Sequence, residues 1–263
     1  MGKMIFGLAC ALLWMGPVSA IAAPAQDFQK SYDLRPDGAV RIRTISGDIR
    51  IQGYDGNKIV VEGFKAGKNC DGVEVVDRSV ENRIDVDVRF QHNSNCDVSF
   101  QVRVPRRTKF NFDTIRSVSG TVQVSDISGR LVVENISGSM EIKGVNGIVS
   151  ATATNGNVVV TNITGIVTAS SISGNVDVLF NRIEGIGDMK FTSISGNVTV
   201  RAPASLDASI SISTLSGTLK TDFPIEIQQR RYMPGSSARG RLGSGAQNIV
   251  IRSVSGRVSL LKM

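Results

Sequence analysis

The chain has 263 residues, of which 41% are hydrophobic, and its length suits one large domain or two small ones. The formal net charge is +7 at pH 7, and His92 is the only histidine, in a polar run typical of a solvated loop. A single histidine in a solvated loop gives no base for a Ser-His-acid site, and one histidine with two distant cysteines does not make a four-ligand structural zinc site, so we expect no cofactor and no metal.

Residues 1–22 have the pattern of a secretory signal peptide. Lys3 supplies the positive start, residues 4–15 the apolar stretch, and the small residues around Ala20 the cleavage site. The apolar stretch is shorter than the ~20 residues of a membrane span, and no later stretch is longer. We therefore expect an exported chain, in the periplasm or at the cell surface, with no transmembrane segment after cleavage.

Removal of the signal peptide leaves two cysteines, Cys70 and Cys96. A cysteine pair in an exported chain favours a disulfide, since the compartment is oxidising. By the loop-entropy description, closing a loop of this size contributes roughly 3.5 kcal/mol to stability, less any strain.

Residues 23–116 are predicted to form an irregular β region that caps a stack of strands. Their apolar runs alternate over longer and less regular segments, and Phe90, Phe100, Phe110 and Phe112 give them a bulkier core. A cap is expected because an uncovered strand edge can pair with another chain. The predicted strands are 39–43, 48–52, 58–62, 73–76, 84–90 and 98–104.

One short motif returns every nine residues from Val118 to Ser173: an apolar residue, then Ser, Asn or Thr, then Gly. Apolar side chains alternate after each glycine, which indicates a strand, and polar pairs such as Ser125-Asp126, Glu134-Asn135 and Ser170-Ser171 are predicted corners. Later copies follow 22 and 21 residues apart, at Ser195 and Ser216. We predict an all-β fold in which residues 117–263 form a β-solenoid, β-helix-like, with two strands per coil.

The alternation also predicts which side chains point inward. The expected outward set is Gln123, Val132, Glu141, Val159, Asp177 and Thr199. The expected inward set is Val122, Val124, Leu131, Val133, Met140, Ile142, Val158, Val160, Val176, Val178, Val198 and Val200.

The positive charge is concentrated near the C-terminus: residues 118–223 have a net charge of −2, and residues 224–263 of +6. Residues 228–248 are rich in Gly, Ser and Arg and are predicted to form a long basic loop. An anionic glycan or a membrane surface is the partner that this loop favours, although its charges could serve only to solvate it. Nucleic acid is excluded, because Tyr232 is the only aromatic residue near the bases. The candidate binding residues are Arg230, Arg231, Arg239 and Arg241.

Three segments resemble the bacterial DUF4097 family of β-strand-repeat proteins, often labelled "putative adhesins". They are Ile45–Ile49 followed by Tyr54-Asp55, the Ile-Ser-Gly-Asn-Val copies that begin at Ile172 and Ile194, and Gly240–Gly245 with its following strand and Ser-Val-Ser-Gly. The resemblance covers residues 28–260. It implies an exported, solenoid-like all-β protein and brings no catalytic residues.

We therefore expect an exported, non-enzymatic protein of the bacterial cell envelope with a surface-binding, adhesin-like or scaffold role. One alternative is a β-helix enzyme that acts on polysaccharides, a lyase or glycosidase, for which Asp177, Glu184 and Asp188 are the candidate carboxylates. Another is an accessory protein of the envelope stress response. The sequence leaves the oligomeric state open.

Overall fold

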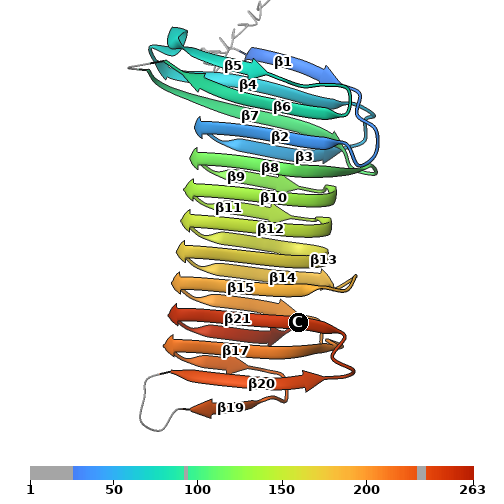
Figure 1. The fold of residues 1–263 in the computed structure, drawn as a ribbon, viewed down its shortest axis with the longest axis vertical. Coiled ribbons are helices and arrows are strands. Elements are labelled where there is room, and N and C mark those ends of the chain that lie inside the picture. The colour runs from blue at the N-terminus through green and yellow to red at the C-terminus, as the bar shows by residue number, and fades with distance from the viewer. Residues whose placement is uncertain (1–25, 92–93, 230–234) are drawn as a thin grey trace, which may run out of the picture.

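The computed structural model describes residues 26–91, 94–229 and 235–263 (Figure 1). The expected signal peptide, His92, Arg230 and Arg231 lie outside these residues. Within them, the only helix is the single 3-10 turn η1 (Cys70–Gly72). The remaining elements are strands, all joined in one 22-stranded sheet, which confirms the all-β expectation.

The strands of the first half are β1 Gln26–Tyr32, β2 Ala39–Ser46, β3 Ile49–Tyr54, β4 Ile59–Lys68, β5 Val73–Asp77, β6 Arg83–Phe90, β7 Asn95–Pro105, β8 Lys109–Ser119, β9 Val122–Ser125, β10 Ser128–Ser137 and β11 Met140–Lys143. Those of the second half are β12 Asn146–Asn155, β13 Val158–Ser173, β14 Val176–Arg182, β15 Asp188–Ser195, β16 Val198–Ala202, β17 Ala208–Ser216, β18 Leu219–Thr221, β19 Glu226–Gln229, β20 Ser236–Leu242, β21 Gln247–Ser255 and β22 Val258–Lys262. The six strands predicted between residues 39 and 104 are all present; β1 was not predicted.

The sheet turns back on itself, so that two walls of strands enclose the core (Figure 1). The front wall runs in the order β6, β2, β8, β10, β12, the second half of β13, β15, β21, β17, β20 and β19. The rear wall runs in the order β7, β3, β9, β11, the first half of β13, β14, β16, β22 and β18.

Neighbouring strands in the middle of the stack are parallel and pair residues 18 apart, as Val122 does with Met140 and Met140 with Val158. Eighteen residues are two copies of the nine-residue motif. One copy therefore contributes to the front wall and the next to the rear wall.

The predicted inside and outside of the strands are confirmed. Every residue of the predicted inward set is at most 2% exposed, and none of the predicted outward set is buried. Val132 and Val159, the two apolar residues of the outward set, are half-buried. Alternate positions of a strand lie on opposite faces, so one wall buries its apolar face against the other.

Every second motif glycine, such as Gly138 and Gly156, turns the chain from the front wall to the rear wall. Gly138 and Gly156 have φ angles of 134° and 152°, a backbone region that favours glycine. A Cβ atom on Gly156 would lie 2.0 Å from the carbonyl oxygen of Gly138, because the corners stack directly on one another. The opposite corners fall at Asp126, Gly144 and Asn162, with φ angles of 56°, 66° and 55°.

Two of the predicted corners are wrong. Glu134-Asn135 and Ser170-Ser171 lie inside β10 and β13, and their second residue points into the core. Buried Asn135 donates to the carbonyl oxygen of Gly120 at 2.8 Å, and buried Ser171 to that of Gly156 at 3.0 Å. A polar residue can lie inward here because a corner carbonyl accepts its hydrogen bond.

The C-terminal strands enter the stack out of chain order. β21 lies between β15 and β17, and β22 lies between β16 and β18. Antiparallel β20 covers the outer edge of β17, and β19 follows it. The predicted loop of residues 228–248 is therefore wrong, since it contains β20 and the start of β21. The edge of β17 supplies hydrogen-bond partners to a segment with few apolar residues.

The N-terminal end is also closed by antiparallel pairs. β4 pairs with β7, β1 with β4, and β5 with β6. The proposed boundary at residue 116 falls within β8, which continues across it. The division into residues 23–116 and 117–263 stays a prediction.

Candidate functional site: the C-terminal basic face

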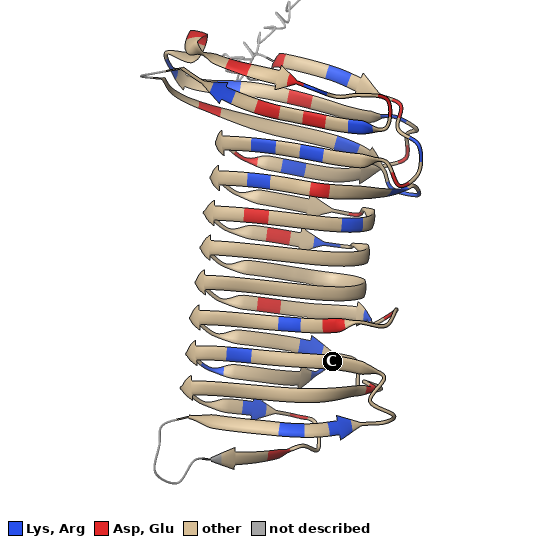
Figure 2. Ribbon diagram, viewed as in Figure 1, with Lys and Arg blue, Asp and Glu red and all other residues tan. Residues whose placement is uncertain are grey.

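Several bases near the N-terminal end of the stack form ion pairs with acids. Arg41 contacts Asp113 at 2.5 Å, and Arg43 contacts Asp85 and Asp87 at 3.1 Å each. The side chain of Asp85 is only 8% exposed, so its charge depends on these arginines. In Figure 2, both blue and red segments are visible on the strands at this end of the stack.

Bases near the C-terminal end have no such partners. Each ion pair between described residues lies before residue 188. Residues 188–229 and 235–263 carry four acids and eight bases: Lys190, Arg201, Lys220, Arg239, Arg241, Arg252, Arg257 and Lys262.

Four of these bases share the outer surface of the front wall, which we call the basic face: Lys190 on β15, Arg252 on β21, and Arg239 and Arg241 on β20 (Figure 2). All four are exposed. β17 lies between β21 and β20 and presents a row of outward serines, Ser209, Ser211 and Ser213. With neighbouring strands ~4.8 Å apart, the face spans on the order of 15 Å along the stack.

The strand register places each arginine of β20 beside a serine of β17. Arg241 lies opposite Ser209, and Arg239 opposite Ser211. Arg239 and Arg241 are two residues apart on one strand, so they point to the same side. Glu226 on β19 is opposite Arg239 and is the acid at this edge of the face.

The other acid on the face, Asp188, already has a partner. The side-chain amide of Asn248 donates to its carboxylate at 2.9 Å. With four bases and two acids, the basic face has a net positive charge.

Two of the four arginines predicted from the sequence belong to this face. Arg239 and Arg241 lie on a paired strand, where the sequence predicted a loop. Arg230 and Arg231 lie outside the described residues. Lys190 and Arg252 were not predicted, because strands that are distant in sequence bring them to the same face. Both occupy outward positions in the alternation of apolar and polar residues, and this was the signal from which the sequence could have pointed to them.

The three candidate carboxylates of the enzymatic alternative do not form one cluster. Asp177 points outward from β14 on the rear wall, and Asp188 points outward from β15 on the front wall. Glu184 pairs with Arg182 at 3.0 Å. Within the described residues, no group of three or more His, Cys, Asp or Glu side chains is placed to hold a metal ion.

Asp207 anchors the connection that brings the chain to the basic face. It precedes β17 and accepts hydrogen bonds from the backbone of Gly245 and Ala246, at 2.6 and 3.0 Å, and from the hydroxyl of Ser244, at 2.8 Å. These bonds, first that from Ala246, lower the pKa of Asp207. The Gly240–Gly245 segment thus crosses from β20, on one side of β17, to β21 on the other.

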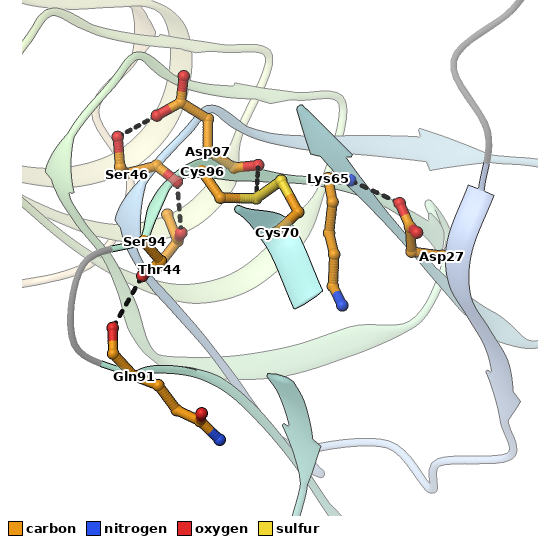
Figure 3. The surroundings of a disulfide bond; sticks show 9 residues. All are labelled: Asp27, Thr44, Ser46, Lys65, Cys70, Gln91, Ser94, Cys96 and Asp97. Carbon is orange, nitrogen blue, oxygen red and sulfur yellow. Dashed lines mark hydrogen bonds between the residues drawn. A yellow bond between two sulfur atoms is a disulfide. The ribbon is translucent and has the colours of Figure 1, made fainter. Parts of the chain in front are cut away.

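The predicted disulfide between Cys70 and Cys96 is present and ties η1 to β7, with Cα atoms 5.2 Å apart (Figure 3). Nearby, Ser46 donates to Asp97, the residue after Cys96. The disulfide therefore joins the cap strands close to the first glycine corner. It is far from the basic face, at the other end of the stack (Figure 1).

The family model for DUF4097, described as Toastrack, matches residues 40–261, and the chain belongs to this family. No curated protein matches. No helix within the described ranges has the length and apolar character that a membrane crossing requires.

Three solved structures are similar over most of their length. A "putative cell adhesion protein" from Clostridium sporogenes is 9% identical, with a TM-score of 0.40, over 90% of this chain and 99% of its own. A "putative adhesin" from Bacteroides fragilis is 16% identical, with a TM-score of 0.35, over 89% and 96%. A "putative adhesin" from Parabacteroides distasonis is 11% identical, with a TM-score of 0.39, over 91% and 98%.

Proposed function

We propose that this protein is an exported, non-enzymatic component of the bacterial cell envelope that binds an anionic surface through its basic face. The binding face is carried on a β-solenoid with two strands per coil. The 18-residue offset between paired strands supports the solenoid. The Cys70–Cys96 disulfide supports export, because such bonds persist in oxidising compartments.

The observation that carries the proposal is the contrast between the two ends of the stack. The arginines of β2 are held by Asp85, Asp87 and Asp113, whereas those of β20 and β21 have no ion pair with a described acid. An unpaired base on an exposed face is free to attract an anion. Each base held near an anionic surface contributes on the order of 1 kcal/mol, and salt screens this attraction within about 10 Å.

The non-enzymatic part of the proposal is supported by the separation of the acids. Glycoside hydrolysis needs two carboxylates flanking one bond, at most roughly 10 Å apart. Asp177 and Asp188 instead face outward from opposite walls.

The test measures retention of the purified chain by anionic surfaces: vesicles that contain phosphatidylglycerol, and beads coated with polygalacturonate. Vesicles of phosphatidylcholine and dextran beads are the neutral controls. At low salt we expect retention by at least one anionic surface and by neither neutral one. Replacing Arg239 and Arg241 with Gln should lower the affinity about tenfold or more.

A charge-matched control separates the basic face from overall charge. Arg35→Gln with Arg103→Gln removes two bases that pair with Glu81 and Glu62 near the other end of the stack. This variant should bind within about threefold of the wild type. Equal losses in the two double variants, or no retention by either anionic surface, would contradict the proposal.

A further inference from the structure

A pocket of about 380 Å³ opens at the edge of the basic face, where β15, β21 and β17 reach the glycine corner. We call it the corner pocket. Its volume is within the roughly 300–1,000 Å³ of small-molecule sites. Ser236 and Ser237 of β20 also line it. Its lining also includes Thr192, Ile194, Ser213, Leu215, Arg252 and Val254.

The lining consists of two columns, one polar and one apolar. Thr192, Arg252 and Ser213 occupy matching positions on the three strands, and Ile194, Val254 and Leu215 lie two residues further along each strand. The apolar three are exposed, at 49%, 44% and 53%. A run of exposed apolar side chains beside polar ones is typical of a binding surface.

The residues between the two columns hold the corner pocket in place. Ser193, Ser253 and Thr214 are buried, and their hydroxyls donate to the carbonyl oxygens of Gly174, Gly196 and Gly256 at 2.9, 2.9 and 3.1 Å. The backbone beneath the corner pocket is therefore fixed to the corner of the next layer. A fixed site loses little conformational entropy when a ligand binds.

The polar column has unused hydrogen-bonding capacity. Arg252 is exposed and has no ion pair with a described acid, and no described residue bonds the hydroxyls of Thr192 and Ser213. No acid lines the corner pocket. The guanidinium of an arginine can donate two hydrogen bonds to one carboxylate. The hydroxyls of the polar column can hydrogen-bond the hydroxyls of a sugar, and the apolar column can pack against the C–H face of a sugar ring.

We propose that the corner pocket binds one acidic sugar unit of an anionic polysaccharide, with its carboxylate on Arg252 and its ring over Leu215 and Val254. The next units of the polysaccharide then lie along β17 towards Arg239 and Arg241. The proposal rests on the proposed function and narrows its anionic surface to an acidic glycan.

The test measures binding of tetragalacturonate to the purified full chain by titration calorimetry, with maltotetraose as the neutral probe. Arg252→Gln removes the carboxylate partner, and Ser213→Ile fills the corner pocket without a change of charge. Each should weaken binding about tenfold, the effect of losing one charge-assisted hydrogen bond or the space for the ring. Maltotetraose should not bind measurably.

Two matched controls keep the test specific to the corner pocket. Arg201→Gln removes an exposed base of β16 on the rear wall, and Ser150→Ile makes the same serine change at an outward position of β12, away from the basic face and the corner pocket. Both should bind tetragalacturonate within about twofold of the wild type. Melting temperatures identify any variant that fails to fold.

The outcomes separate this inference from the proposed function. If the corner-pocket variants and their controls bind tetragalacturonate alike, the corner pocket is not the site, while retention through Arg239 and Arg241 still supports the proposed function. If phosphatidylglycerol vesicles retain the chain and tetragalacturonate does not bind, the partner is a lipid surface and the inference is wrong. Equal binding of maltotetraose also overturns it. If no anionic probe binds, both proposals fail.

Discussion

Adjacent residues of a single strand have opposite surroundings in this stack. On β14, Val178 is fully buried between the walls, whereas Asp177 faces outward. The same alternation places Arg239 and Arg241 outside and Ala238 inside on β20. The effect of a substitution therefore depends on whether the residue points inward or outward more than on its distance from either end of the stack.

Val178→Asp and Asp177→Asn are expected to differ strongly in stability. The first buries a carboxylate with no partner, which should cost about 3 kcal/mol or more; the second changes an outward side chain and should be nearly silent. Urea unfolding followed by circular dichroism measures both. Equal midpoints for the two variants would show that the inside and outside of β14 are assigned wrongly.

The side chains that donate hydrogen bonds to the corners also differ from residue to residue. Buried residues two positions before the motif serines donate hydrogen bonds to the corner carbonyls, as Ser171 and Ser193 do. Ala153 occupies the corresponding position on β12 and has no group to donate. The ladder of side-chain bonds is therefore interrupted there, and backbone hydrogen bonds, such as that from Gly156 to the carbonyl oxygen of Ser173 at 3.0 Å, hold that corner.

At the scale of the elements, the glycine corner lets the chain pass from a strand of the front wall to a strand of the rear wall. Each corner glycine lies against the carbonyl oxygen of the next, so the layers approach more closely than any side chain allows. This close approach explains why the motif keeps glycine while its neighbour varies among Ser, Asn and Thr.

Gly156→Ala is expected to destabilise the protein by several kcal/mol. Its φ of 152° is unfavourable for alanine, at about 1–3 kcal/mol, and the new Cβ would meet the Gly138 oxygen at 2.0 Å. Gly187→Ala is the matched control, since its Cβ would meet nothing closer than 3.8 Å. Thermal unfolding measures both. A Gly156 variant as stable as the Gly187 variant would refute close stacking at this corner.

At the scale of the whole molecule, the last strands of the chain complete the interior of the stack. β21 forms parallel ladders with both β15 and β17, and β22 does so with β16 and β18. The basic face and the corner pocket both need this insertion, because it places Arg252 beside Ser213.

Deleting residues 247–263 should therefore also unfold a neighbouring part of the remaining chain. Without β21 and β22, the ladders that join β17 and β18 to β15 and β16 are gone, and residues 203–246 should become sensitive to protease. Deleting only Met263, an exposed terminal residue, is the control. Limited proteolysis with mass spectrometry follows both. Protection of residues 203–246 in the longer deletion would contradict the insertion.

The sequence by itself determined the all-β fold, the inward residues and the disulfide. These features follow from local rules: strand side chains alternate, and only two cysteines follow residue 22. The order of the layers does not follow from such rules. Ser195, Ser255 and Ser216 lie on successive layers although Ser255 comes last in the chain.

The tertiary structure alone decided how the basic face is assembled. Local patterns made the segment around Arg239 look like a loop, because its few apolar residues give no strand signal. The segment forms strand β20 because the free edge of β17 supplies partners for its backbone hydrogen bonds. The inserted β21 brings Arg252 to the same face. Both effects are pairings between segments far apart in sequence. Any strand with a free edge can make such pairings, so only the folded chain shows which are formed.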